Sequence, residues 1–169
     1  GYTARRLVAL TAVSKLVPGA GMLITGIILL VIDLSRAGGK KTARDASYSN
    51  AMWIGICQGL AVFPGLSRSG MTISAGLMSG FSYSFAVKYS YIMSVPAIAG
   101  ALVMELGQFG SADMTVGLGF TYILGMIISG IVGCFTIRGL LKIVHKGRFR
   151  HFAVYCFVIG LLVLIMNFA

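Results

Sequence analysis

The sequence predicts an all-α, polytopic membrane helical bundle, because it is apolar, poor in charge and basic mainly between its apolar runs. Of its 169 residues, 57% are hydrophobic and 11% are charged, whereas a soluble domain carries about 25% charged residues. The alternation that marks a membrane β-barrel is not visible in the sequence. We therefore expect a single transmembrane domain over residues 1–169.

Four apolar runs account for the membrane-spanning helices. Each can span or nearly span a hydrocarbon core of ~30 Å, because a helix rises ~1.5 Å per residue. We expect these helices over residues 16–33, 85–106, 116–137 and 151–168.

The net charge of +10 lies mostly outside these runs, because eleven of the fourteen Lys and Arg residues fall in three short segments, 5–6, 36–44 and 138–150. Two basic segments occupy 34–49 and 138–150, while 107–115 contains Asp113 and neither Lys nor Arg. The positive-inside rule places the two basic segments in the cytoplasm and 107–115 outside. No interleaving of aromatic and basic residues accompanies the charge, so nucleic-acid binding is not expected.

Residues 49–81 are expected to form a re-entrant helix pair. With both basic segments inside and 107–115 outside, the chain makes one net crossing between them, and 85–106 supplies it. The arms before Pro64 and after Ser69 hold about 15 and about 12 residues, so each reaches only ~18–23 Å, too short to span. The irregular tip between them must be buried in protein or line a watery cavity.

The tip, residues 63–72, holds the most informative residues of the chain. A charge at that depth costs roughly 2.5–3.5 kcal/mol on insertion scales, so Arg68 is a functional-site candidate by default. Pro64 and Gly65 break the helix, and the next helix, from about Ser69, directs its free N–H groups toward whatever Arg68 holds. Arginine, hydroxyls and a helix N-terminus together predict an anion site, with phosphate the expected anion. The alternative is that Ser67 and Ser69 are only helix caps.

The pattern Pro-Gly-x-Ser-Arg-Ser-Gly-x-Thr at Pro64–Thr72 resembles the signature of the bacterial undecaprenyl-diphosphate phosphatases, or bacitracin-resistance proteins. The flanking segments 55–61 and 86–96 agree with it, and the resemblance covers about residues 17–169. It implies one half of an inverted-repeat fold with a re-entrant pair in each repeat. It also implies a multi-pass protein of the bacterial plasma membrane that hydrolyses a C55 polyprenyl diphosphate at the outer face and so recycles the cell-wall carrier lipid.

The resemblance also assigns site residues. It places Arg68 and Ser67 in catalysis, and it suggests Gln58 as a supporting residue. The residues it implies for phosphate binding are Gly65, Ser67, Arg68, Ser69, Gly70 and Thr72. Arg68 suits this task because its guanidinium forms two parallel hydrogen bonds to phosphate. A divalent cation is implied by the family, but no ligand for it is identified in this sequence.

One departure from the family is serious. Its first motif, Glu-Gly-x-x-Glu-Phe followed by Pro-x-Ser-Ser-x-Gly-His, has no match here, and Gln58 stands where that motif has its first glutamate. Residues 17–22 resemble that motif only weakly, and we interpret them as a helix irregularity. We therefore expect a C-terminal fragment, about two-thirds of a full protein, that is inactive on its own.

The acidic residues agree with this expectation, because none is near the tip in sequence; they are Asp33, Asp45, Glu105 and Asp113. Only Glu105 is a distant candidate for the general base. His145 and His151 are expected at lipid headgroups rather than in catalysis.

Small residues at four-residue spacing, which let helices approach closely, occur in both arms of the hairpin. They are Gly55 and Gly59 before the tip, and Gly76 and Gly80 after it.

Two other functions fit the pattern. A polyprenyl-phosphate flippase or anion transporter also uses broken helices aimed at an anion. A non-catalytic subunit could use Arg68 to bind lipid headgroups. Release of phosphate from a diphosphate lipid separates the enzyme from both. Besides the lipid substrate and the bilayer, the partners compatible with the sequence include further copies of the chain.

Overall fold

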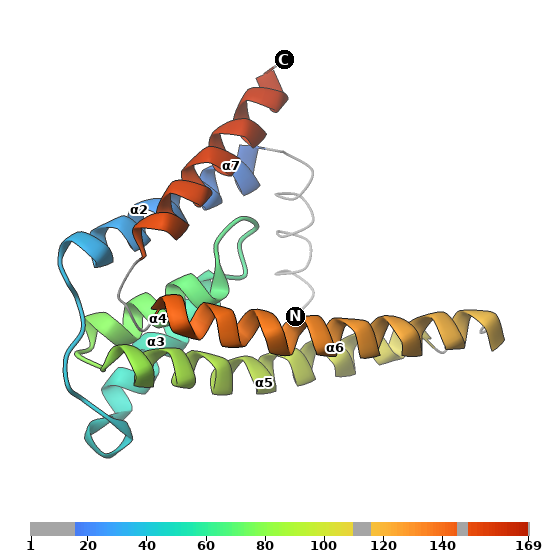
Figure 1. Cartoon of the computed structure of the whole chain (residues 1–169), viewed down its shortest axis with the longest axis horizontal. Coiled ribbons are helices and arrows are strands. Elements are labelled where there is room, and N and C mark those ends of the chain that lie inside the picture. Colours follow the sequence, from blue (N-terminus) through green and yellow to red (C-terminus); the bar gives the residue numbers. More distant parts are fainter. Residues whose placement is uncertain (1–15, 110–115, 145–148, 169) are drawn as a thin grey trace.

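The computed structural model describes residues 16–109, 116–144 and 149–168, which are helical throughout apart from loops and turns. Four of its helices are long and apolar enough to cross a membrane by length and composition, which confirms the predicted all-α membrane fold (Figure 1). In chain order the elements are α2 (Leu16–Leu34), the 3-10 turn η1 (Ala43–Asp45), α3 (Tyr48–Leu60), α4 (Arg68–Met78), α5 (Tyr83–Phe109), α6 (Val116–Val144) and α7 (Arg150–Phe168).

Helix α6 is longer than the apolar run that predicts it. The run ends at residue 137, but the helix continues to Val144 and takes in the first part of the basic segment. The added residues are mostly good helix formers, including Arg138 and Lys142. Basic residues also suit a helix C-terminus, where the macrodipole is negative.

Helices α2 and α7 pack closely, side by side and antiparallel (Figure 1). Glycines allow this approach: a Cβ on Gly19 would lie 2.8 Å from the Leu164 side chain, and one on Gly160 would lie 3.1 Å from the Gly19 carbonyl oxygen. At the other end of the pair, the Phe149 N–H donates to Asp33 Oδ1 over 2.9 Å. That bond places the end of α2 beside the start of α7.

The loop after α2 is tied to the turn between α4 and α5. The Gly39 N–H donates to the Phe81 carbonyl over 3.0 Å, and the Lys41 N–H donates to the Gly80 carbonyl over 3.2 Å. A Cβ on Gly39 would lie only 2.3 Å from the Gly80 oxygen, so only glycine fits there. Since α3 starts at Tyr48, just after this loop, the α3–α4 hairpin leaves from and returns to the same loop. This path is the one expected of a re-entrant pair, whose depth in a membrane stays a prediction.

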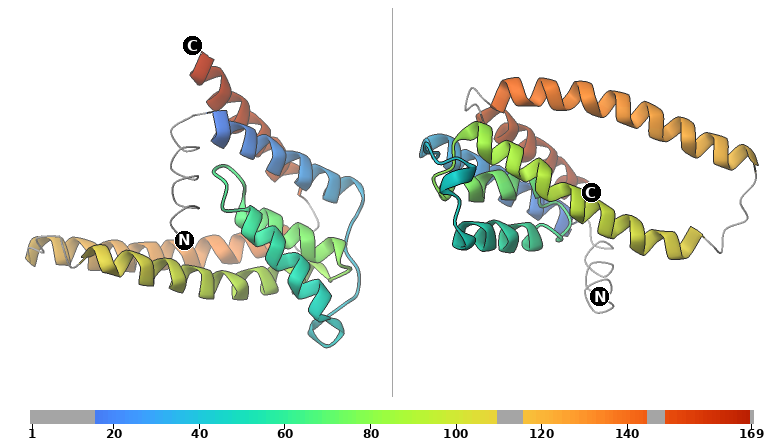
Figure 2. Two further views of the ribbon diagram at one scale, coloured as in Figure 1. Left: turned by 180° about the vertical axis from the view of Figure 1, so that it is seen from behind. Right: turned by 90° about the horizontal axis from the view of Figure 1, so that it is seen from below.

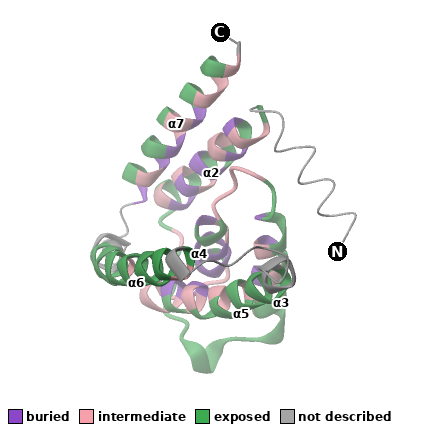
Figure 3. Ribbon diagram, turned by 90° about the vertical axis from the view of Figure 1, so that its right-hand side faces the viewer, coloured by how far each residue is buried: buried purple, intermediate pink, exposed green. Residues whose placement is uncertain are grey.

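Burial divides the helices sharply (Figure 3). Helix α4 is the most enclosed, with every residue from Thr72 to Leu77 buried. It packs among Ile54, Phe81 and Val87 in the hydrophobic core. Helix α6 runs back along α5 but stands apart from it over much of its length (Figure 2), and none of its residues between 118 and 139 is buried.

The glycine spacing in the hairpin predicts its packing only in part. Among the described residues, nothing lies within 4 Å of a Cβ built on Gly55 or Gly59. Gly76 does meet a neighbour, since its Cβ would lie 3.3 Å from that of Ala86 on α5, whereas Gly80 has a φ of +84° and serves the turn. The closest helix contact through glycine is the one between α2 and α7.

Candidate phosphate site

The first turn of α4 presents the residues of the predicted anion site. Ser67 is the N-cap, and its Oγ accepts a hydrogen bond from the Gly70 N–H over 3.1 Å. The Ser67 and Ser69 hydroxyl oxygens lie 3.5 Å apart. The helix starts at Arg68, one residue earlier than expected, and Arg68 and Ser69 are both exposed. Ser67 is therefore a cap, and its hydroxyl can still donate one hydrogen bond, to Ser69 or to a ligand.

The loop before α4 rests on α2 through Thr25. Thr25 Oγ1 accepts the Ser67 N–H over 3.1 Å and lies 3.0 Å from the Gly21 carbonyl and 3.4 Å from the Gly65 carbonyl. Its side chain is only 2% exposed. This single hydroxyl fixes where α4 begins. The motif gave no sign of Thr25, and a lone polar residue inside an apolar run is the only signal that points to it.

Backbone contact between the loop and α2 is equally tight. Gly65 has a φ of +87°, and a Cβ there would lie 2.1 Å from the Pro18 carbonyl oxygen. A Cβ on Gly21 would lie 2.5 Å from the Pro64 oxygen. The interpretation of residues 17–22 as a helix irregularity is wrong, because α2 is regular from Leu16. Gly21 meets the backbone of this loop, whereas Gly19 meets α7, so each glycine of the stretch serves a close contact.

Thr72 is buried and ties α4 to α5. Its Oγ1 lies 3.0 Å from the Arg68 carbonyl and 2.6 Å from Ser90 Oγ. Thr72 is 2% exposed and Ser90 is 5% exposed. The Thr72 hydroxyl thus makes its hydrogen bonds inside the protein. It can position Arg68, but it does not face the open side of the site.

Arg68 opens into a polar cavity of about 430 Å³ between the loop, α4 and α5. Three residues of α5 complete its wall, Ser90, Tyr91 and Ser94, and none of them belongs to the predicted site. Asp33 binds Phe149 and Asp45 binds Thr42, so neither of these described carboxylates serves Arg68. The side chain of Glu105, and Asp113 and His145 altogether, lie outside the described residues.

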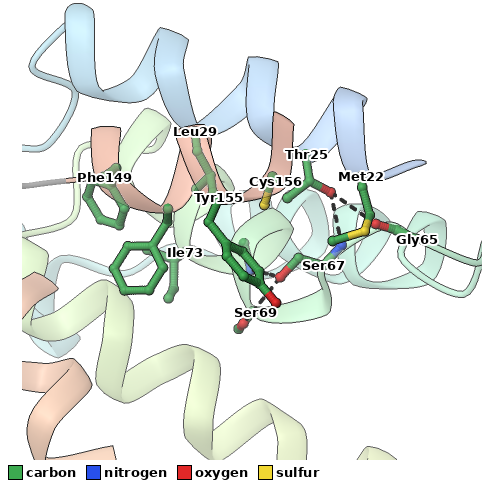
Figure 4. Close-up of a pocket in the computed structure, with 12 residues that line it drawn as sticks. Met22, Thr25, Leu29, Gly65, Ser67, Ser69, Ile73, Phe149, Tyr155 and Cys156 are labelled. Atoms are coloured by element: carbon green, nitrogen blue, oxygen red, sulfur yellow. Dashed lines mark hydrogen bonds between the residues drawn. The ribbon is translucent and has the colours of Figure 1, made fainter. Parts of the chain in front are cut away.

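A second cavity, of about 260 Å³, lies on the other side of the α4 N-terminus, between α2, α4 and α7. Ser67 and Thr25 lie toward one side of it, and Leu29, Ile73 and Phe149 lie toward the other (Figure 4). Gly65 and Gly70 also line it. Ser69 lines both cavities, so the two meet at the first turn of α4.

Gln58 lies in the last turn of α3 and lines neither of these cavities. Its Oε1 is buried and finds no hydrogen-bond partner among the described residues. An orphaned buried acceptor of this kind costs about 1–3 kcal/mol. Gln58 is therefore close to the tip in the sequence but does not line either cavity in the structure.

The described donors suit an anion better than a hard cation. Within residues 16–109, 116–144 and 149–168, no group of three His, Cys, Asp or Glu side chains gathers to hold a metal. The cavity beside Arg68 offers guanidinium and hydroxyl groups, whereas Mg²⁺ and Ca²⁺ prefer carboxylate oxygens. The described part of the chain does not fit a divalent cation.

Comparison with known proteins gives a consistent match. The family model described as bacitracin resistance protein BacA matches residues 1–162. A curated undecaprenyl-diphosphatase of Desulforapulum autotrophicum is 43% identical over 157 residues, which are 92% of this chain and 55% of that protein. One of Halothermothrix orenii is 36% identical over 148 residues, 88% of this chain and 57% of that protein. One of Methanosphaera stadtmanae is 37% identical over 153 residues, 87% and 54% of the two chains. The chain spans about half the length of these relatives.

Proposed function

The chain belongs to the bacitracin resistance protein BacA family, and from that premise we propose that it supplies the phosphate-binding part of an undecaprenyl-diphosphate phosphatase in a bacterial plasma membrane. The proposed reaction is the hydrolysis of the lipid's phosphoanhydride, which releases phosphate and leaves undecaprenyl phosphate. The names of the relatives support this proposal, since they are called undecaprenyl-diphosphatase.

The observation behind the proposal is the exposed Arg68 at the N-terminus of α4, in a cavity with Ser69. The guanidinium can grip two oxygens of the transferring phosphate and offset the charge that develops there. The first N–H groups of a helix lack partners within it and lie at the positive end of its dipole. Ser67 takes up the Gly70 N–H, so the N–H groups of Arg68 and Ser69 are left for the anion.

The remaining residues of the motif hold this arrangement in place. Gly65 lets the loop lie on α2, and Ser67 caps α4. Gly70 donates to that cap, and Thr72 joins the helix to α5 through Ser90. In this proposal Arg68 and Ser69 contact the phosphate, and Ser67 lies beside it. Thr72 positions Arg68 through the hydrogen bond to the Arg68 carbonyl.

Activation of water needs another group. None of the residues that line the two cavities is a carboxylate or a histidine. General-base catalysis is therefore not assigned to the described part of this chain. The divalent cation and an assembly of several copies rest on the sequence-based expectations alone, and the proposed task of Arg68 requires neither.

The test is to place the natural, full-length protein in vesicles that contain undecaprenyl diphosphate and to follow phosphate and lipid separately. We expect phosphate release that saturates with the lipid. Movement of the lipid across the bilayer without phosphate release would favour the flippase instead. Binding of the lipid with neither movement nor release would favour the non-catalytic subunit.

A further inference from the structure

The cavity between α2, α4 and α7 has chemistry that phosphate binding does not use. Its walls include Leu29, Ile73, Phe149 and Phe152. Leu29 and Ile73 are each 6% exposed and Phe149 is 3% exposed, so this wall is part of the packed interior. A formed cavity with apolar walls and a few polar groups at one side is typical of a ligand site.

The position of this cavity identifies the ligand class. Ser69 lines both it and the polar cavity of Arg68, and Ser67 lies within 3.5 Å of Ser69 through their hydroxyls. One ligand can therefore place an anionic group beside Arg68 and pass an apolar chain over the first turn of α4. A lipid whose diphosphate is joined directly to a hydrocarbon chain has this form.

We propose that the cavity between α2, α4 and α7 binds the first isoprene units of the polyprenyl chain, while the Arg68 cavity holds the diphosphate. The inference rests on the proposed function and adds the site of the lipid tail. At about 260 Å³ the cavity is smaller than the ~300–1,000 Å³ of drug-sized ligand sites, so it takes only the part of the chain next to the diphosphate. The rest of the chain lies outside it.

Cys156 offers a way to fill this cavity. It lies on α7 in the cavity wall and is 8% exposed. Cys156→Phe adds a ring there, while Cys134→Phe makes the same change on α6, where the side chain is exposed and lines neither cavity. In the natural, full-length protein, the first variant should raise the KM for farnesyl diphosphate by about tenfold, as a misfit in an apolar pocket does. The KM for methyl diphosphate, which has no isoprene unit, should stay within about twofold of the starting value.

The control variant should alter neither KM. If Cys156→Phe raised the KM for both substrates equally, the cavity would be needed for folding and not for the lipid tail. If it raised neither KM, the cavity would not hold the tail. Either result would overturn the inference. If the unaltered protein hydrolyses no diphosphate at all, the proposed function fails, and the lipid-tail site is then judged by a measurement that needs no turnover.

That measurement is photolabelling with a farnesyl diphosphate that carries a diazirine on its first isoprene unit. We expect label in the peptide that contains residues 149–156, and little in α6. The same diazirine on farnesol, which lacks the diphosphate, should label this peptide much less. Equal labelling by the farnesol probe would show a general lipid crevice, and labelling mainly of α6 would show a site elsewhere; either result overturns the inference.

Discussion

Helices α4 and α6 differ sharply in how far the rest of the protein encloses them. Helix α4 has 11 residues and is buried from Thr72 to Leu77. Helix α6 has 29 residues and shows no buried side chain between 118 and 139. An apolar helix exposed all round is unstable in water but suits a lipid solvent.

The two helices also differ in the partners of their polar groups. The polar groups at the start of α4 are costly in a bilayer, and each is held by a partner or opens into a cavity. On α6, by contrast, the Thr136 hydroxyl donates within its own helix, to the carbonyl of Val132. Changes around α4 should therefore cost much more than matched changes on α6.

The largest effect is expected from Gly65→Ala. The methyl group would lie 2.1 Å from the Pro18 oxygen, in a residue whose φ is +87°. Strained backbone alone costs of the order of 1–3 kcal/mol, and the clash adds to it. Thermal unfolding in detergent should show a clear loss of stability. Gly125→Ala on α6, where nothing described lies within 4 Å, is the control and should leave stability unchanged or raise it by up to about 1 kcal/mol. Similar behaviour of the two variants would break the contrast.

Thr25→Val is expected to come next. The change keeps the shape of the side chain but leaves the Ser67 N–H without its acceptor, at a cost of about 1–3 kcal/mol. Phosphate release should fall as well, because α4 no longer starts at a fixed place. Thr136→Val on α6 removes a hydroxyl that bonds only within its own helix and should cost within about 0.5 kcal/mol. If Thr25→Val changed neither stability nor the rate of phosphate release, α2 would not be what holds the start of α4 in place.

A smaller effect is expected for the bond between Thr72 and Ser90. In a double-mutant cycle of Thr72→Val and Ser90→Ala, the unfolding free energies should reveal a coupling of about 0.5–1.5 kcal/mol. The pair lies 2.6 Å apart and is buried, so the single changes should not be additive. Strict additivity would mean that the two hydroxyls do not hold α4 to α5.

The smallest effect is expected at Asp45, in the loop between α2 and α3. The Thr42 backbone N–H donates to its carboxylate and holds the pKa of Asp45 below its usual value, and the Thr42 hydroxyl adds to this. Because the pKa is lowered in the folded loop, the stabilisation is present above the unfolded pKa of about 3.9 and is lost as the pH falls below it. The protection of the Thr42 amide from hydrogen exchange, measured against its intrinsic exchange rate at each pH, should therefore fall on acidification, and Asp45→Asn should remove that change in protection. The whole protein's melting temperature should barely respond.

Much of this fold was predictable because a bilayer imposes simple rules. Long apolar runs such as 16–33 must be helices there, whatever they pack against. The charges of 34–49, 107–115 and 138–150 predicted a hairpin that leaves and returns at one side of the membrane. The backbone bonds from Gly39 and Lys41 to Phe81 and Gly80 are compatible with that path, whose place in a membrane stays a prediction.

The site was less predictable because it depends on contacts between distant parts of the chain. Thr25 and Ser67 are 42 residues apart, and Phe149 and Cys156, from the C-terminal part of the chain, line the same cavity as Ser67. The sequence motif places Arg68, Ser67 and Thr72 together but does not reveal that Thr72 is buried. Nor does it show that two cavities of different polarity meet at Ser69.

The proposal that Arg68 grips the phosphate can be tested by the rate of phosphate release from undecaprenyl diphosphate by the natural, full-length protein. Arg68→Lys keeps the charge but loses the planar fork, and the rate should fall on the order of 10²-fold. Arg68→Ala should lose more while the protein still folds. Arg138→Ala, the same change at an exposed position on α6, should leave the rate within about twofold. If folded Arg68→Ala protein instead releases phosphate at nearly the unaltered rate, Arg68 does not bind the phosphate that is transferred, and the account is wrong at its centre.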